Sequence, residues 1–320
     1  MTGQLQEGQT FTGTSRFIAF VNLVRLPHTV FALPFALIGV VLASYRHRLR
    51  LTEIGWVILA FTAARFAAMA FNRIVDRHID AQNPRTSMRE LPRGVLSVQE
   101  AWISVVVSVG VFLVAAAALN PLCLALAPLA ILWVLGYSFT KRFTRWSHLV
   151  LGAGLGIAPV GGYLAVAGAW SHPWWLLVAL STAVTTWVGG FDILYALPDE
   201  GFDRAHSLHS IPAALGERRA IYVARGLHAV TILALLLTGI GAHLGPLYWC
   251  GLLIAAAILL YEHSLVHPGN LTKLDAAFFM MNGMLSITLL FFVLAERIRL
   301  HYFILRIIYV SEFCELADEP

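Results

Sequence analysis

The residues best suited to chemistry lie in FNRIVDRHID, residues 71–80, where Asn72, Asp76 and Asp80 recur every four positions. A helix turns by about 100° per residue, so the three side chains stay within roughly 80° of one another on one helical face. Hard divalent cations such as Mg²⁺ take oxygen ligands and commonly share them with substrate phosphates. The stripe therefore predicts a cation site at one end of a helix.

A second acidic cluster occurs in DILYALPDEGFD, residues 192–203, where Asp192, Asp199 and Asp203 again fall on one helical face. Pro198 lies inside this pattern and lacks a backbone N–H donor, so it kinks or ends a helix. We expect Asp203 to lie in a loop or in a separate helical turn.

An alternative is that these acids only pair with the nearby arginines Arg73, Arg77 and Arg204 as solvated charges. Two stripes of matched spacing at one opening favour the cation site. Their five carboxylates would otherwise repel one another.

The stripes must be positioned by membrane helices. The chain has 320 residues, of which 58% are hydrophobic and 12% charged, against about 45–50% and about 25% in soluble domains. A crossing takes about 20 apolar residues, which predicts an all-α polytopic bundle of about nine helices. The expected spans are 17–44, 51–75, 99–119, 121–139, 146–169, 174–197, 219–242, 245–262 and 274–296.

We expect one domain at residues 16–297, preceded by a disordered tail at 1–15. The remaining residues, 298–320, comprise an apolar segment at 298–311 and a polar tail. The apolar segment is too short for a comfortable crossing and is expected to lie at the membrane interface.

The basic residues indicate the orientation of the bundle. If the spans alternate, most Lys and Arg residues fall on the side of the acidic stripes, although Arg46, Arg48 and Arg50 fall on the other. The positive-inside rule then places the N-terminus and the acidic loops in the cytoplasm, in a bacterial-type inner membrane. Because orientation explains the net charge of +4, the chain is not expected to bind nucleic acid.

Together the two stripes resemble the motifs of the UbiA superfamily of intramembrane aromatic prenyltransferases. The first motif is matched by residues 72–80 and the second, DxxYAxxDxxxD, by residues 192–203. The similarity runs from RLPH at 25–28 to MNG at 281–283 and includes the loop NPRTSMRELPRG at 83–94. It implies a nine-helix bundle around a cavity that opens to the cytoplasmic side and laterally to lipid.

The resemblance implies Mg²⁺-dependent transfer of a polyprenyl group from polyprenyl diphosphate to a ring carbon of an aromatic carboxylic acid. GYSFTKRFTRWSHLVLG, residues 136–152, is most similar to members acting on 4-hydroxybenzoate in ubiquinone biosynthesis. The FDR and LHSIP elements at 202–212 are equally similar to members that prenylate a dihydroxynaphthoate acid in menaquinone biosynthesis. Both acceptors stay open.

The resemblance also assigns roles to residues. The implied metal ligands are Asn72, Asp76, Asp80, Asp192, Asp199 and Asp203. Arg25 and Lys141 match basic positions that contact diphosphate, and Tyr137 lies one turn before Lys141. For the acceptor, Arg142 is our candidate for the carboxylate contact and Asp192 for the general base.

The prenyl tail requires an apolar trough. Spans one, eight and nine offer many large apolar side chains, although such residues are ordinary in any membrane helix. The residues expected there are Phe31, Phe35, Phe278, Phe279, Met280 and Met281.

Two other functions fit parts of the pattern. Intramembrane acids also mark cation paths, so a cation-coupled transporter is one alternative. A non-catalytic lipid-binding relative is another. The crowding of the acids at one face with basic partners favours the enzyme.

Overall fold

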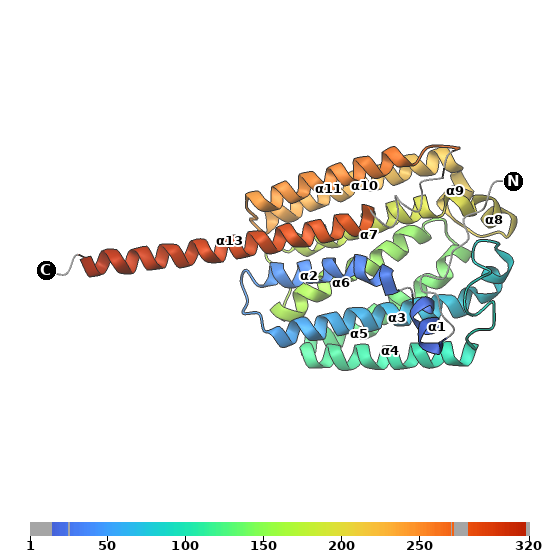
Figure 1. Cartoon of the computed structure of the whole chain (residues 1–320), viewed down its shortest axis with the longest axis horizontal. Coiled ribbons are helices and arrows are strands. Elements are labelled where there is room, and N and C mark those ends of the chain that lie inside the picture. The colour runs from blue at the N-terminus through green and yellow to red at the C-terminus, as the bar shows by residue number, and fades with distance from the viewer. Residues whose placement is uncertain (1–14, 25, 270, 272–280, 318–320) are drawn as a thin grey trace.

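The computed structural model describes residues 15–24, 26–269, 271 and 281–317, with the backbone alone for 26–31 and 301–317. These residues form a helical bundle (Figure 1). Its elements are α1 (Arg16–Leu23), α2 (Leu26–Ala43), α3 (Leu51–Gln82), α4 (Val98–Leu119), α5 (Pro121–Gly136), η1 (Tyr137–Arg142), α6 (Ser147–Ala167), α7 (Trp175–Tyr195), η2 (Leu197–Asp199), α8 (Glu200–Ala205), α9 (Ile211–Leu215), α10 (Glu217–Gly241), α11 (Pro246–Leu265) and α13 (Asn282–Ala317).

The bundle has the composition of an integral membrane protein. Seven helical segments of the described chain are long and apolar enough to cross a bilayer: α3, α4, α5 with η1, α6, α7, α10 and α11. Large apolar side chains such as Val106, Leu132 and Leu253 are exposed on its outer surface, where lipid rather than water is the favourable solvent. The predicted all-α membrane fold is confirmed.

The first expected span was wrong as a single helix. Residues 17–44 comprise two helices, because α1 ends at Leu23 and α2 starts at Leu26. The expected tail at 1–15 falls almost wholly outside the described residues. Ser15, the described residue of that tail, caps α1 by accepting a hydrogen bond from the Ile18 N–H.

The last helix also differs from expectation. α13 continues without a break from Asn282 to Ala317, so residues 298–311 extend the helix of the last expected span rather than form a separate helix. Figure 1 shows this extension projecting beyond the other helices, at the end of the bundle opposite α8 and α9.

α3 determines where the first acidic stripe lies. Its 32 residues rise by about 48 Å, more than the roughly 30 Å of a bilayer's hydrocarbon core. Asn72, Asp76 and Asp80 occupy its last turns, at the end of this long helix. α7 ends at Tyr195, and Asp203 lies on the separate short helix α8. The break expected at Pro198 is confirmed.

Glycines allow the central helices to approach closely. α6 packs between α2 and α7. A Cβ atom on Gly162 would lie 2.1 Å from the Ala36 carbonyl oxygen of α2, and one on Gly152 would lie 2.2 Å from that of Thr185 on α7. Small residues at such crossings are typical of membrane helices. The close crossings hold α6 between the two helices on either side of it.

We predict that Gly162→Ala lowers stability by about 1–3 kcal/mol, because the added methyl group would force two backbones apart. The neighbouring Gly161 has nothing within 4 Å of its Cβ position, so Gly161→Ala should be neutral or stabilising by up to about 1 kcal/mol. Thermal unfolding of both variants in one detergent measures the difference. Equal melting temperatures would contradict the close crossing.

Candidate functional site

A cavity of about 660 Å³ runs along one face of α3. The lining residues of α3 recur every three or four positions, as one helical face requires. They are Val57, Ala60, Phe61, Ala64, Arg65, Ala68, Met69, Asn72, Arg73, Asp76, Ile79 and Asp80. Between Val57 and Asp76 the helix rises by about 28 Å. The cavity is therefore long, with an apolar end near Val57 and an acidic end near Asp76.

The apolar wall differs from the expected one. It is formed by α3 together with residues of α4, α5 and α6, such as Leu119, Leu126 and Leu155, while the first expected span contributes Ala32 and Ala36 of α2. Phe35 is instead buried in the core against Trp187, and Met281 lies in the same core. The side chain of Phe31 and all of residues 278–280 lie outside the described part of the chain.

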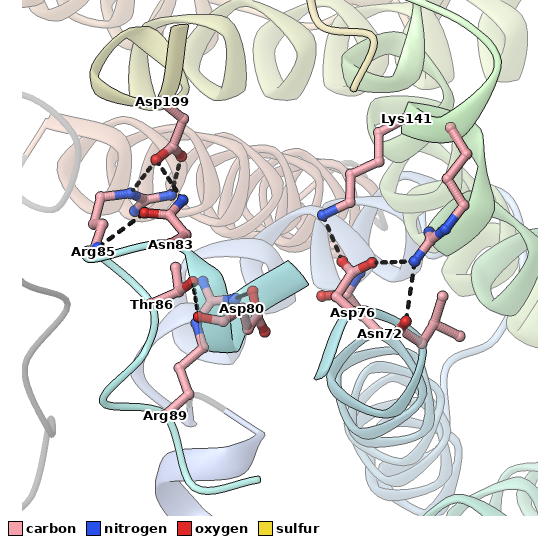
Figure 2. A network of polar contacts seen from close by, with 11 residues as sticks. Asn72, Asp76, Asp80, Asn83, Arg85, Thr86, Arg89, Lys141 and Asp199 are labelled. Carbon is pink, nitrogen blue, oxygen red and sulfur yellow. Dashed lines mark hydrogen bonds and ion pairs between the residues drawn. The ribbon is translucent and has the colours of Figure 1, made fainter. Parts of the chain in front are cut away.

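Asp76 is the best-compensated acid of the site (Figure 2). Its side chain is 2% exposed. Lys141 Nζ lies 2.7 Å from Oδ2 and Arg142 Nη2 lies 2.9 Å from Oδ1. Asn72 Nδ2 donates to Oδ2 at 3.0 Å. Two cations from η1 thus neutralise the carboxylate of α3.

Asp80 is neutralised from the loop after α3. Arg89 Nη1 donates to Oδ1 at 2.7 Å, and the Thr86 hydroxyl donates to the Asp80 carbonyl oxygen at 3.1 Å (Figure 2). The other carboxylate oxygen, Oδ2, is buried without a hydrogen-bond partner. A buried, unsatisfied carboxylate oxygen is costly, so this atom is suited to receive a cation.

Asp199 fastens the same loop to η2. Asn83 Nδ2 and Arg85 Nε donate to Oδ1 at 3.0 and 2.9 Å, and Arg85 Nη2 contacts Oδ2. Such a two-pronged guanidinium contact is among the stronger ion-pair geometries. The same guanidinium lies 4.8 Å from the centre of the Tyr195 ring. The acidic end therefore joins α3, its loop and η2.

Asp192 has a histidine partner. His148 Nδ1 lies 2.7 Å from Asp192 Oδ2, and the Ile211 N–H points to His148 Nε2 at 3.4 Å. Because Nε2 faces a donor, the network assigns the ring proton to Nδ1, which donates to Asp192. The buried imidazole orients the carboxylate at the edge of the cavity.

Asp203 lies on α8, outside the membrane-spanning helices. Burial raises the pKa of its carboxyl above the ordinary value, while a hydrogen bond from Ser210 opposes the rise. The raised pKa means that desolvation disfavours the charged form. A cation placed beside Asp203 would again favour the charged carboxylate.

Most of the predicted site residues meet at this cavity. Those that line it are Asn72, Asp76, Asp80, Tyr137, Lys141, Asp192, Asp199 and Asp203. Arg25 lies outside the described residues. Arg142 is not among the lining residues of the described cavity; besides Asp76, it donates to the carbonyl oxygens of Ser138 and Val75.

The alternative, in which the acids pair with Arg73, Arg77 and Arg204, is contradicted for two of these three arginines. Arg77 donates to the Ile74 carbonyl oxygen, and Arg204 pairs with Glu200. Arg73 is buried and lines the cavity.

Within the described part of the chain, no group of three His, Cys, Asp or Glu side chains is arranged to hold a metal ion alone. Asp76, Asp80 and Asp199 are instead each paired with a lysine or arginine side chain. Mg²⁺ is commonly bound by one or two carboxylates plus water and substrate phosphates, so this spacing does not conflict with a metal shared with a ligand.

Sequence reasoning missed four residues that complete the site: Asn83, Arg85, Arg89 and His148. The loop at 83–94 was noticed, but its residues were not given roles. A usable signal was the need for counter-charges, since buried carboxylates require partners and two arginines follow the first stripe directly. His148 is an ionisable residue at the start of a span, which is itself a functional signal.

The fold and the site define a class: a helical membrane protein whose cavity suits an anionic head group and a long apolar tail. Comparison with known proteins makes this specific, because residues 32–284 match the model of the UbiA prenyltransferase family. The chain belongs to this family and is a prenyltransferase. The transporter and the non-catalytic relative are thereby set aside.

Individual relatives agree with the family assignment. The 4-hydroxybenzoate octaprenyltransferase of Vibrio cholerae is 32% identical over 212 residues, covering 65% of this chain and 72% of that protein. The apo structure of a UbiA homolog from Aeropyrum pernix K1 has a TM-score of 0.77 and 31% identity, covering 84% of this chain and 97% of that one. A UbiA homolog from Archaeoglobus fulgidus bound to DMAPP and Mg²⁺ has a TM-score of 0.67 and 21% identity over 87% and 99%.

We predict that Arg85→Gln accelerates hydrogen exchange in residues 84–96, because it breaks the ion pair that fastens this loop to Asp199. Global stability should change little, since local openings need not involve the core. Arg93→Gln is the control, as Arg93 is exposed in the same loop. Hydrogen–deuterium exchange mass spectrometry measures both variants, and identical exchange in the two would show that the pair does not hold the loop.

Proposed function

We propose that this prenyltransferase moves a polyprenyl group from polyprenyl diphosphate to a ring carbon of 4-hydroxybenzoate, with Mg²⁺ as cofactor. The observation that carries the proposal is one continuous cavity that joins the carboxylates and cations at its acidic end to a trough nearly as long as a bilayer is thick. The name of the Vibrio cholerae relative supports this acceptor and a long prenyl chain.

The acidic end fits Mg²⁺. Asp80 has a buried oxygen without a partner, and Asp203 lacks a full counter-charge. The metal ligands that we propose are Asn72, Asp76, Asp80, Asp192, Asp199 and Asp203. The bound ion would neutralise the diphosphate leaving group and position it. The Archaeoglobus fulgidus structure, which holds DMAPP and Mg²⁺, supports this choice.

The cations of the site recognise the diphosphate. Lys141, Arg85 and Arg89 line the cavity while they pair with Asp76, Asp199 and Asp80. When ligand and metal arrive together, each acid gains a metal and each cation gains a phosphate oxygen, so no charge is left uncompensated. We propose that Arg25 and the Tyr137 hydroxyl also contact the diphosphate.

The acceptor attacks through the ring carbon beside its hydroxyl. The new bond joins this carbon to the allylic carbon, the bond from the allylic carbon to the diphosphate oxygen breaks, and the ring proton leaves. We propose that Asp192, oriented by His148, accepts this proton. Arg142 is committed to Asp76 and two carbonyl oxygens, so we assign the acceptor's carboxylate to Arg65, which lines the cavity two turns from Asn72.

The same proposal puts the diphosphate end on the cytoplasmic side of a bacterial-type inner membrane. The excess of Lys and Arg in the loops at this end supports it. A dihydroxynaphthoate acid is the second candidate acceptor, since it presents the same pairing of a phenol and a carboxylate.

We predict that purified protein with Mg²⁺ and a polyprenyl diphosphate prenylates 4-hydroxybenzoate, and that Asp76→Ala lowers the rate by at least about 10²-fold, the scale of losing one electrostatic stabiliser of a transition state. Glu200→Gln is the matched control, because Glu200 pairs with Arg204 outside the cavity and should leave the rate unchanged. Product formation is followed by mass spectrometry, with a dihydroxynaphthoate acid as the second acceptor.

Three results would count against the proposal. They are no product from either acceptor, full activity without Mg²⁺, and undiminished product in Asp76→Ala. Product from the naphthoate acid alone would support prenyl transfer but show that the acceptor is the naphthoate acid rather than 4-hydroxybenzoate.

We further predict that Ala60→Phe shortens the prenyl chain that the enzyme accepts. Ala60 lines the cavity 16 positions before Asp76, about 24 Å away along the helix. A long-chain diphosphate should lose at least about tenfold in kcat/KM, since it must displace the added ring. Geranyl diphosphate is too short to reach Ala60 and serves as the internal control for folding. Equal losses for both substrates would place the tail elsewhere.

A further inference from the structure

A buried polar network joins α7 to α10, α11 and α13. It comprises Trp187 of α7, His228 of α10, Glu262 and His263 of α11, and Asn282 of α13. Glu262 is 1% exposed, and its Oε2 atom has no hydrogen-bond partner. An acid inside a membrane bundle is expensive to keep, so its contacts point to a function.

The side chains form a directed chain of hydrogen bonds. Trp187 Nε1 donates to Asn282 Oδ1 at 2.7 Å, and Asn282 Nδ2 donates to Glu262 Oε1 at 3.2 Å. An indole can only donate, so Asn282 must present its carbonyl oxygen to Trp187 and its amide nitrogen to an acceptor. Glu262 is that acceptor, and it thereby determines which way the Asn282 amide points.

The backbone of Trp187 is held by His228 of α10, which in turn contacts His263, the residue after Glu262 on α11. His228 Nε2 lies 3.2 Å from the Trp187 carbonyl oxygen, and His228 Nδ1 lies 3.0 Å from His263 Nε2. A Cβ atom on Gly190 would lie 2.3 Å from the His228 ring, so a glycine is needed for this approach. Neighbouring residues of α11 thus hold Trp187 at both its ring and its carbonyl group.

The held ring lies where the buried core borders the cavity, with the Phe35 ring centre 4.9 Å from its own. Trp187, Phe191 and Asn282 all line the cavity, and the Trp187 ring centre lies 5.1 Å from that of Phe191 in an edge-to-face arrangement. Trp187 precedes Asp192 by five positions on α7, which is about 7.5 Å of rise. The indole therefore lies on the prenyl side of the acidic end, where positive charge develops as the allylic carbon leaves the diphosphate. The face of a tryptophan ring attracts such a charge.

We propose that Glu262 is a positioning residue that acts through Asn282 to hold the Trp187 ring against the developing allylic cation. The inference rests on the proposed prenyl transfer. It assigns Trp187 as a catalytic residue of this reaction and gives the buried Glu262 a role that ordinary interhelical packing does not require.

Four variants separate this role from packing. Trp187→Leu removes the ring and Trp187→Phe keeps an aromatic face. Glu262→Leu removes the acceptor and Glu262→Gln keeps one for Asn282. Glu296→Leu is the matched control, because Glu296 is an equally buried acid that caps the start of α11 through the Leu247 N–H.

The readouts are kcat and KM for polyprenyl diphosphate, and the ¹⁹F spectrum of protein labelled with 5-fluorotryptophan. The Trp187 resonance is assigned by its absence from Trp187→Phe. We expect Glu262→Leu and Trp187→Leu each to lower kcat about tenfold with KM changed less than about twofold, as for an interaction made mainly in the transition state. The double variant should be no slower than either single one, since both act through one ring.

The ¹⁹F spectrum distinguishes a positioning role of Glu262 from a role in helix packing alone. Glu262→Leu should shift or broaden the Trp187 resonance, Glu262→Gln should restore both the resonance and kcat, and Glu296→Leu should change neither. An unshifted Trp187 resonance in Glu262→Leu, or a shifted one with normal kcat, would overturn the proposal. Failure of the proposed function is distinct, because wild-type protein would then give no product while its ¹⁹F spectrum could still be recorded.

Discussion

The site depends on one constraint: a carboxylate removed from water must be given a counter-charge. Asp76 meets it with a cation from η1, and Asp80 and Asp199 each meet it with an arginine from the loop after α3. Breaking such a pair leaves an unpaired buried charge and is therefore strongly unfavourable. The acids consequently determine the conformation of the segments around them, and chain segments without regular helix are ordered at the mouth of the cavity.

The same pairs prepare the site for a highly charged ligand. A diphosphate with its metal brings both signs of charge, so acids and cations can exchange partners without any group becoming unpaired. A site lined by acids alone would repel the diphosphate, and one lined by cations alone would not bind the metal. Pairing also explains why the acids do not converge into a metal cluster among the described residues, since Asp76, Asp80 and Asp199 are each drawn toward a lysine or arginine.

The features that the sequence could predict are those made by residues close together along the chain. Both stripes and the break at Pro198 are local features, visible as spacing along one helix. The partners of the acids are separated from them by up to more than 100 residues, as for Arg85 and Asp199, and no periodicity reveals such a pair. The residues that line the apolar part of the cavity were not predicted, for another reason. Every membrane helix is apolar, so composition does not show that Leu119 lines a cavity while Phe35 is packed in the core.

α7 connects the acidic end of the cavity with the buried polar network around Trp187. One end carries Asp192, held by His148 of α6, and the middle carries Trp187, held by α10, α11 and α13. α6 fixes α7 through His148 and through the close crossing at Gly152. The second half of the bundle adds hydrogen bonds to Trp187, which are directional where apolar packing is not. A rotation of α7 would move Asp192 and the indole together, so one set of buried contacts can register both with the same reacting bond.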